Sequence, residues 1–263
     1  QIQDPVNPVK APRRGGKVEF KNVTFTYPGA AEPVLHNISF IALPGETTAF
    51  VGSTGSGKST IINLIPRFYD ATNGQVLVDD IDVRAMKQKD LRERIGYVSQ
   101  KAMLFSGTIK DNIIYGNPRA SQEEILQAAA TAQALEFIKE LEQTFDSSIA
   151  QAGSNFSGGQ KQRLAIARAL AKNPELYLFD DSFSALDFKT DTALRHALKT
   201  EAKGKTVIIV TQRIATIMNA DKIIVIDKGE IVGQGTHKSL LRTCKTYREI
   251  AASQLAPEEL ARF

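Results

Sequence analysis

The sequence has few of the features that would take it out of the ordinary globular class. It contains one cysteine, Cys244, so no disulfide can form within the chain, and we expect a reducing compartment, most simply the cytosol. We find no apolar run near the ~20 residues of a membrane span, and we expect no signal peptide. By itself this chain is therefore expected not to cross a membrane.

The sequence also has no strong charge of one sign. Its net charge of +4 is mild and spread along the chain, which gives little support to nucleic-acid binding, and we expect no nucleic-acid partner. Hydrophobic residues make up 42% and charged residues 24%, as in a soluble globular protein. The 263 residues are enough for one large domain or two small lobes with a sizeable core.

One stretch organises the rest of the chain, and it fits the spacing Gly-x-x-x-x-Gly-Lys-Ser of a phosphate-binding loop. Its residues are Gly52, Ser53, Thr54, Gly55, Ser56, Gly57, Lys58, Ser59 and Thr60. The glycines allow a tight turn that aims backbone N–H groups at phosphate oxygens. Lys58 brings a positive charge to the β- and γ-phosphates, and the hydroxyl of Ser59 can ligate Mg²⁺. An apolar strand at 48–51 precedes the loop and a helix at 60–65 follows it, so we predict binding of a nucleoside triphosphate.

The coarse pattern predicts an α/β fold. Residues 1–16, rich in proline and glycine, are typical of a linker or of the cut end of a longer polypeptide. Alternating and apolar runs predict strands at 18–27, 34–43, 74–78, 95–98, 176–179, 207–210, 223–226 and 230–232. The pattern is helical from 108 to 141, with a capping box at 121–124, and again from 188 to 200. The first strands favour antiparallel β structure around the phosphate-loop strand, with a helical subdomain inserted at about 101–172.

A carboxylate closes the apolar strand at 176–179. Asp180 would lie at the carboxyl end of a parallel strand, in the crevice where ligands bind. We expect it to hold Mg²⁺, directly or through water, opposite Ser59. Many strands end in Asp, and it is the pairing with the phosphate loop that makes this prediction specific.

A second glycine-rich stretch precedes the helix that begins near residue 158. Ser157 can cap that helix, and Gly158 and Gly159 leave its first N–H groups unobstructed, which creates another anion site. An ordinary Ser-Gly-Gly cap would have the same form. Followed by Gln160 and by Gln162-Arg163, however, it resembles the signature motif of the ATP-binding cassette (ABC) ATPases. The resemblance covers nearly all of residues 17–253 and leaves 254–263 as a tail.

The resemblance implies a P-loop NTPase (RecA-like) core and a set of further site residues. Gln100 is similar to the family's Q-loop glutamine, a catalytic residue and Mg²⁺ ligand, and Asp187 to its D-loop aspartate. Tyr27 takes the place of the aromatic residue that stacks on adenine, although it could instead be a strand residue packing in the core. The stretch 100–113 resembles the export branch, where it faces coupling helices of a transmembrane domain; a surface loop is the alternative.

Two positions depart from the family at residues expected to be catalytic. Asp181 stands where a glutamate normally acts as general base, and it is one methylene shorter. Gln212 stands where the family has a switch histidine; it can donate a hydrogen bond but cannot carry charge. A softer departure lies at 149–154, where Gln151 and Ala152 lack expected charges.

These residues favour one functional hypothesis and leave another open. The first is an ATP- and Mg²⁺-dependent ATPase domain that drives an exporter from the cytoplasmic face of the cell membrane, together with a transmembrane domain and a second, non-identical ABC subunit. Its own site would hydrolyse slowly, and its signature, Ser157 to Gln160, would act on the partner's ATP. The alternative is an ATP-dependent regulatory clamp without significant turnover, and sequence drift without functional meaning would also explain the two changes. A soluble ABC ATPase of DNA repair or translation is disfavoured, because the chain has no coiled-coil insertion and no strong basic patch.

Overall fold

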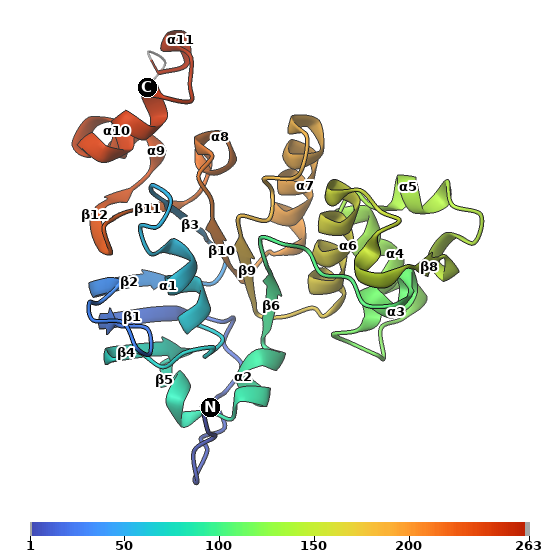
Figure 1. The fold of residues 1–263 in the computed structure, drawn as a ribbon, viewed down its shortest axis with the longest axis horizontal. Coiled ribbons are helices and arrows are strands. Elements are labelled where there is room, and N and C mark those ends of the chain that lie inside the picture. The colour runs from blue at the N-terminus through green and yellow to red at the C-terminus, as the bar shows by residue number, and fades with distance from the viewer. Residues whose placement is uncertain (1, 261–263) are drawn as a thin grey trace. The chain divides into compact units, whose positions relative to one another are not determined.

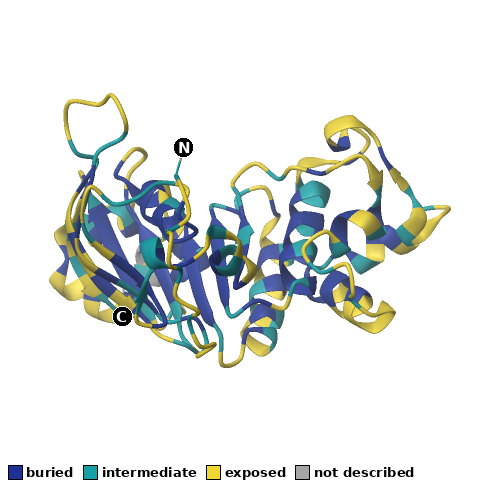
Figure 2. Cartoon of the chain, turned by 90° about the horizontal axis from the view of Figure 1, so that it is seen from below, coloured by how far each residue is buried: buried dark blue, intermediate teal, exposed yellow. Residues whose placement is uncertain are grey.

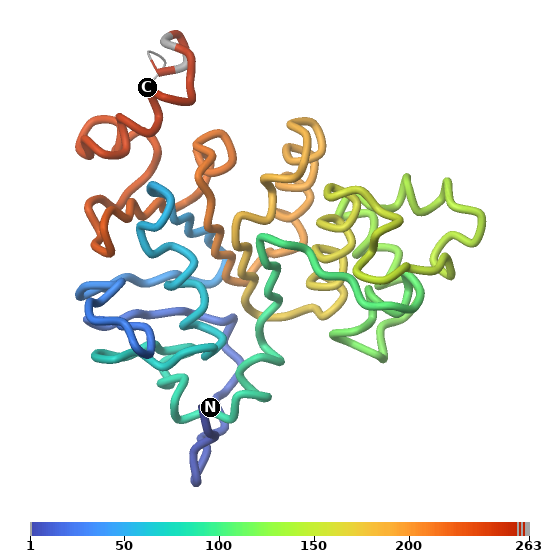
Figure 3. The backbone as a smooth tube through the Cα atoms, viewed as in Figure 1, coloured from blue at the N-terminus to red at the C-terminus, as the bar shows by residue number. Residues whose placement is uncertain are grey.

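The computed structural model describes residues 2–260. Residue 1 of the expected linker and residues 261–263 of the expected tail lie outside the described residues. The chain forms two compact units, which we describe separately. The first comprises Gln1–Ile95, Glu175–Asp180 and Gly204–Phe263, and the second comprises Gly96–Pro174 and Asp181–Lys203. The path of the chain through its helices and strands is drawn in Figures 1 and 3.

An antiparallel sheet opens the first unit, in the strand order β2-β1-β4-β5. Its strands are β1 (Val18–Phe25), β2 (Leu35–Ala42), β4 (Asn73–Val78) and β5 (Ile81–Asp82). Buried and exposed residues alternate along β2, as expected for a strand with one face against the core. Phe40 of β2 stacks on Phe20 of β1 and contacts Phe50 edge to face, which packs this sheet against the strand before the phosphate loop.

The second sheet of this unit holds the strands in the order β12-β11-β3-β10-β9. They are β3 (Thr47–Val51), β9 (Leu176–Asp180), β10 (Thr206–Val210), β11 (Lys222–Asp227) and β12 (Glu230–Gly235). The pairs β3–β10, β9–β10 and β3–β11 are parallel, whereas β11 and β12 form an antiparallel hairpin. Every residue of β9 and β10 is buried, which explains their continuous apolar sequences (Figure 2).

Short helices complete the first unit. They are α1 (Lys58–Leu64), η1 (Val83–Ala85), α2 (Gln88–Glu93), α8 (Ile214–Ile217), α9 (His237–Thr243), α10 (Lys245–Ala252) and α11 (Pro257–Leu260). His237 is buried and its Nδ1 lies 2.7 Å from the hydroxyl of Tyr247, whereas His36 and His196 are exposed. The phosphate-loop helix starts at Lys58, two residues earlier than the sequence pattern indicated.

Helices make up most of the second unit. Its elements are β6 (Ile95–Val98, which begins on the last residue of the first unit), β7 (Gly107–Thr108), α3 (Ile109–Ile114), α4 (Gln122–Thr131), α5 (Leu135–Lys139), η2 (Thr144–Asp146), β8 (Ser148–Ile149), η3 (Gln151–Gly153), α6 (Gly158–Ala171) and α7 (Phe188–Glu201). The capping box at Ser121 is present, because its hydroxyl accepts from the backbone N–H of Glu124, whose carboxylate accepts from Ser121 N–H. The stretch from 108 to 141, predicted to be helical with a helix start at Ser121, contains three helices, α3, α4 and α5.

The observed architecture confirms the predicted α/β fold class with an antiparallel sheet, a parallel sheet and a mainly helical unit. Within residues 2–260, no helix is both long and apolar enough to span a bilayer.

Candidate nucleotide-binding site

The phosphate loop joins the end of β3 to the start of α1. Gly52 has no room for a side chain, because a Cβ there would lie 2.1 Å from the carbonyl oxygen of Ile226. Gly57, the N-cap residue of α1, has a φ of 105°, which few other residues tolerate. Within the described chain, no side chain caps this helix. A helix start without a side-chain cap suits a ligand of negative charge.

Lys58 folds back over the loop that it belongs to. Its Nζ donates to the carbonyl oxygens of Gly52, at 2.8 Å, and Ser53, at 2.6 Å. The residue is only 7% exposed. The Lys58 ammonium therefore lies at the loop. Phosphate oxygens of a ligand could accept hydrogen bonds from its Nζ in place of these carbonyl oxygens.

Ser59 and Asp180 come together from positions 121 residues apart. The Oγ of Ser59 donates to Oδ1 of Asp180 at 3.0 Å. Asp180 is the last residue of the buried strand β9, and Ser59 lies in the first turn of α1. Both are hard oxygen ligands, which fits Mg²⁺, an ion usually bound by one or two protein groups together with water and substrate phosphates. No cluster of three or more His, Cys, Asp or Glu suited to a metal occurs among the described residues.

Tyr27 lies just beyond β1, half-buried between two other aromatic rings. Its ring meets Phe25 at 4.8 Å and Tyr69 at 5.1 Å between centroids, both edge to face. Its hydroxyl lies 3.0 Å from the Oγ1 of Thr60, which follows Ser59 on α1. The sequence analysis had no signal for the Thr60 contact, since it depends on the pairing of β1 with the rest of the sheet.

Gln212 also contacts the phosphate loop. It follows β10 by two residues, and its Oε1 accepts a hydrogen bond of 3.4 Å from the Oγ1 of Thr54. Both side chains are exposed. The residue at the expected switch position therefore faces the loop through a neutral amide and not an imidazole. Ser53, Gly55 and Ser56 complete the loop, and Ser56 Oγ lies 3.3 Å from the Nζ of Lys58.

In the second unit the structure pairs Gln100 with Asp181. The Nε2 of Gln100, just after β6, donates to Oδ2 of Asp181 at 3.3 Å. Asp181 has a φ of 45°, a left-handed conformation that aspartate adopts more readily than most residues. Next to it, Ser182 donates to the carbonyl oxygen of Val98 at 2.7 Å, which fixes the start of the 181–187 loop to the end of β6.

The signature stretch forms the start of α6 with a complete capping box. Ser157 Oγ accepts from the N–H of Gln160 at 3.2 Å, and Gln160 Oε1 accepts from the N–H of Ser157 at 2.9 Å. A Cβ at Gly158 would meet nothing within 4 Å, and one at Gly159 would lie 3.3 Å from the carbonyl oxygen of Ala185. The spacing Ser-x-x-Gln is visible in the sequence, so the capping role of Gln160 was a signal that the sequence analysis did not use.

Asp187 caps the next helix, α7. Its carboxylate accepts hydrogen bonds from the Oγ1 of Thr190, at 2.7 Å, and from the N–H of Thr190, at 3.0 Å. These bonds lower the pKa of Asp187, with the side-chain bond the larger cause. The D-loop aspartate of the prediction is thus held ionised at the N-terminus of a helix, where negative charge is favourable.

Two residues at the ends of the signature stretch, Asn155 and Arg163, make contacts that the sequence did not predict. Asn155 accepts from Ala150 N–H and donates to the carbonyl oxygen of Ser148, both at 3.0 Å, which closes the loop that carries Gln151 and Ala152. Arg163 donates to the carbonyl oxygen of Gln133 and lies 4.7 Å over the ring of Phe137. Burial lowers the pKa of this guanidinium.

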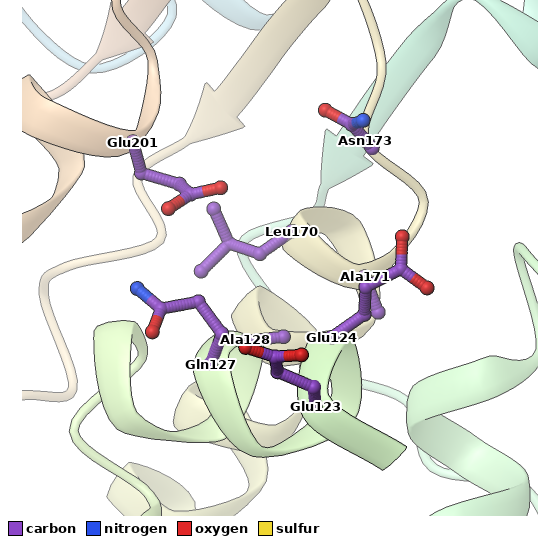
Figure 4. A pocket seen from close by; sticks show the side chains of 8 residues that line it. All are labelled: Glu123, Glu124, Gln127, Ala128, Leu170, Ala171, Asn173 and Glu201. Atoms are coloured by element: carbon purple, nitrogen blue, oxygen red, sulfur yellow. The ribbon is translucent and has the colours of Figure 1, made fainter. Parts of the chain in front are cut away.

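The second unit also has a hollow of about 390 Å³ away from these residues (Figure 4). It lies beside α4, the C-terminal end of α6 and the C-terminal end of α7. Its lining residues are Glu123, Glu124, Gln127, Ala128, Leu170, Ala171, Asn173 and Glu201. None of them belongs to the predicted site, and Glu124 is already engaged in the cap of α4.

A glycine-rich loop between a buried parallel strand and a helix, with an aspartate ending a strand of the same sheet, defines the class of P-loop NTPases. The chain belongs to the ABC transporter family, because residues 35–184 match the model of that family. The family resemblance drawn from the signature is thereby confirmed.

Close relatives are ABC transporter proteins. An uncharacterized ABC transporter ATP-binding protein of Mycobacterium tuberculosis is 50% identical over 258 residues, which is 96% of this chain and 44% of that protein. An ATP-dependent lipid A-core flippase of Haemophilus influenzae is 46% identical and covers 93% of this chain and 42% of that protein. Among solved structures, a bacterial Atm1-family ABC exporter with ATP bound superimposes with a TM-score of 0.92 and 40% identity, over 97% of this chain and 45% of that one. The chain therefore spans less than half the length of these relatives.

Proposed function

We propose that this chain is the ATP-binding and ATP-hydrolysing domain of an ABC exporter. In this proposal it works at the cytoplasmic face of the cell membrane, joined to or associated with a transmembrane domain. The observation that carries ATP and Mg²⁺ binding is the contact of Ser59 with Asp180 beside the phosphate loop. The length of the relatives and the names of the flippase and the exporter support the attachment to a membrane domain.

The residues of the first unit would divide the work of binding between them. The ring of Tyr27 stacks on adenine, and the N–H groups of the loop together with Lys58 hold the phosphates. Ser59 and Asp180 would hold Mg²⁺, which would supply positive charge beside the phosphates. In hydrolysis water attacks the γ-phosphorus and the bond to the β-phosphate oxygen breaks, which yields ADP and phosphate.

We further propose that this chain's own site is slow and that its partner is a non-identical ABC subunit. Asp181, the residue in the position of the general base, is one methylene shorter than glutamate. A displacement of about 1 Å can cost ~10²-fold in rate. Gln212 cannot supply the charge of an imidazolium. The signature of the same chain keeps its serine and both glycines, so it can complete the partner's site.

An exposed aromatic patch supports a membrane-domain partner. Met103, Phe105 and Tyr115 are 70%, 42% and 64% exposed, and the rings of Phe105 and Tyr115 stack at 4.5 Å. The Arg168 guanidinium lies 4.9 Å from the centre of the Phe105 ring and donates to the carbonyl oxygen of Met103, so both residues are bound to α6. Such a rigid apolar surface in the segment similar to exporters is suited to a helix from the membrane domain.

The test of this proposal is steady-state hydrolysis by the chain alone, with and without the substitutions Asp181→Glu and Gln212→His together. We expect slow turnover in the wild type and a clear increase in the double variant. Wild-type turnover in the ordinary enzymatic range of ~1–10³ s⁻¹ would show that the site is not slow. Tight ATP binding with no hydrolysis in either form would favour the regulatory clamp instead.

A further inference from the structure

The segment that precedes β1, dark blue in Figure 3, belongs to the first unit. Its backbone makes hydrogen bonds at several points although its side chains are mostly exposed. Val9 N–H donates to the carbonyl oxygen of Ala85 at 2.8 Å, and the carbonyl oxygen of Gly15 accepts from the Oγ1 of Thr206 at 3.1 Å. We call residues 9–17 the strap.

Asp79 is the main anchor of the strap. Its side chain is fully buried, and its Oδ1 accepts from the N–H groups of Gly16, at 3.1 Å, and Lys17, at 2.9 Å. Its Oδ2 accepts from the N–H of Arg14 at 3.3 Å. A carboxylate that accepts several backbone N–H groups makes charge-assisted bonds, about twice as strong as neutral ones.

Arg94 joins this anchor to the strap's other carbonyl groups. Its guanidinium, 7% exposed, donates to the carbonyl oxygens of Ala11 and Pro12 and pairs with Asp79 at 3.3 Å. Glu175 lies 3.7 Å from the same nitrogen. Burial is the main reason why the pKa of Glu175 is raised. One buried cation thus holds two backbone carbonyls and faces two carboxylates.

Two glycines let the strap approach the sheet closely. A Cβ on Gly16 would lie 2.9 Å from the carbonyl oxygen of Glu175, and one on Gly15 would lie 2.9 Å from Pro44 Cβ. Both have positive φ angles, 92° for Gly15 and 77° for Gly16. Glu175 directly precedes β9, and its own carbonyl accepts from the N–H of Thr206, the first residue of β10.

We propose that the strap is a fixed part of the nucleotide-binding unit, clasped by Asp79, Arg94 and Glu175 at the start of β9 and β10. This step rests on the proposed function: with a transmembrane domain joined ahead of the strap, the clasp would make a pull on the preceding chain act on β9. That strand is five residues long and wholly buried, and it ends in the Mg²⁺ ligand Asp180. A flexible linker would not transmit the same displacement to β9.

The test compares two glycines with similar backbone angles. Gly16→Ala forces the strap away from Glu175, whereas Gly45→Ala, at a φ of 82°, adds a Cβ that meets nothing within 4 Å. The measurement is the rate of trypsin cleavage after Arg13 and Arg14 in the folded chain. We expect at least a ~10-fold faster rate for Gly16→Ala than for the wild type or Gly45→Ala. Thr206→Val, which removes one bond to the strap and keeps the branched shape, should have a smaller effect in the same direction.

Hydrogen exchange gives a second readout in the same proteins. In Gly16→Ala, loss of the bonds to Asp79 should reduce the protection of the backbone amides at positions 16 and 17 by ~10²-fold. The β9 amides should stay protected, which shows that the chain is folded. Exchange of these two amides at unstructured rates in the wild type, or equal cleavage in all variants, would overturn the strap. ATP binding, measured by calorimetry, should be unchanged in Gly16→Ala. A wild type that binds no ATP but keeps the cleavage contrast would contradict only the proposed function.

Discussion

Two glycine-rich helix starts lie in this chain, and they present their N–H groups differently. In the first unit, α1 begins at Gly57 with no side-chain cap among the described residues, and a cation folds over the loop. In the second unit, α6 begins at Ser157 with a capping box that satisfies two of its own donors. At α1, a ligand would take the place of the missing side-chain cap. At α6, the capping box uses the N–H groups of Ser157 and Gln160, and the N–H groups of Gly158 and Gly159 lie between them.

This difference indicates separate tasks. A glycine-rich loop with a lysine and a helix start that no side chain caps binds polyphosphate strongly by itself. A capped, neutral helix start binds weakly alone and suits an anion already held by another subunit.

Removing the cation of the phosphate loop should have the largest effect. We expect Lys58→Ala to weaken binding of Mg-ATP by the isolated chain by about 10²-fold, because the loop loses charge-assisted bonds to the phosphates. Lys161→Ala is the matched control; its Nζ donates to the carbonyl oxygen of Ala152 in the signature region. Calorimetry should give wild-type affinity for this control. Equal losses in the two variants would mean that the regions are not distinct in ATP binding.

Changing the charge of the signature cap should have the next largest effect. Gln160→Glu preserves the capping box, since glutamate caps as well as glutamine. It adds a negative charge beside the expected anion site, so we expect ~10–10²-fold lower ATP turnover in the assembled pair. Gln160→Ala removes the bond from Ser157 N–H to the Gln160 side chain, at a cost of about 1 kcal/mol of stability, keeps the bond to Ser157 Oγ and adds no charge.

The measurements are steady-state ATPase activity of the pair and the melting temperature of the isolated chain. If Gln160 acted only as a structural cap, the order would reverse, with the alanine variant worse in both readouts.

The adenine side of the site should give the smallest effect. Tyr27→Phe keeps the ring and loses the hydroxyl near Thr60, so we expect ~2–10-fold weaker binding of ATP and ADP alike. Tyr27→Ala also loses the stacking, worth ~1–3 kcal/mol. Titration of both nucleotides distinguishes the two contributions. A loss confined to ATP would contradict the adenine role, because stacking does not sense the γ-phosphate.

Much of this fold could be predicted from the sequence because its signals are local. The buried strands β9 and β10 are continuous apolar runs, and Ser121 and Ser157 carry helix caps within four residues. The contact of Ser59 with Asp180 was also predictable, since a phosphate loop and a strand ending in aspartate have fixed places in such a sheet.

Other features depend on contacts between distant segments and had no sequence signal. Asp79 follows an ordinary strand, and nothing near it predicts that it holds residues 14–17. The hydrogen bond between Tyr27 and Thr60 and that from Thr54 to Gln212 depend on the tertiary packing of separate elements. Pairing of Gln100 with Asp181 likewise requires the loop after β9 to be fixed at Val98.

We propose that this chain binds nucleotide with its phosphate loop and activates its partner's nucleotide with its signature. The most direct measurement is steady-state ATPase activity of the assembled pair, with Gly158→Asp or Asp181→Ala in this chain alone. We predict that Gly158→Asp lowers turnover sharply, by ~10²-fold or more, and that Asp181→Ala has little effect. Turnover that survives Gly158→Asp and is abolished by Asp181→Ala would contradict the account and give this chain its own fast site.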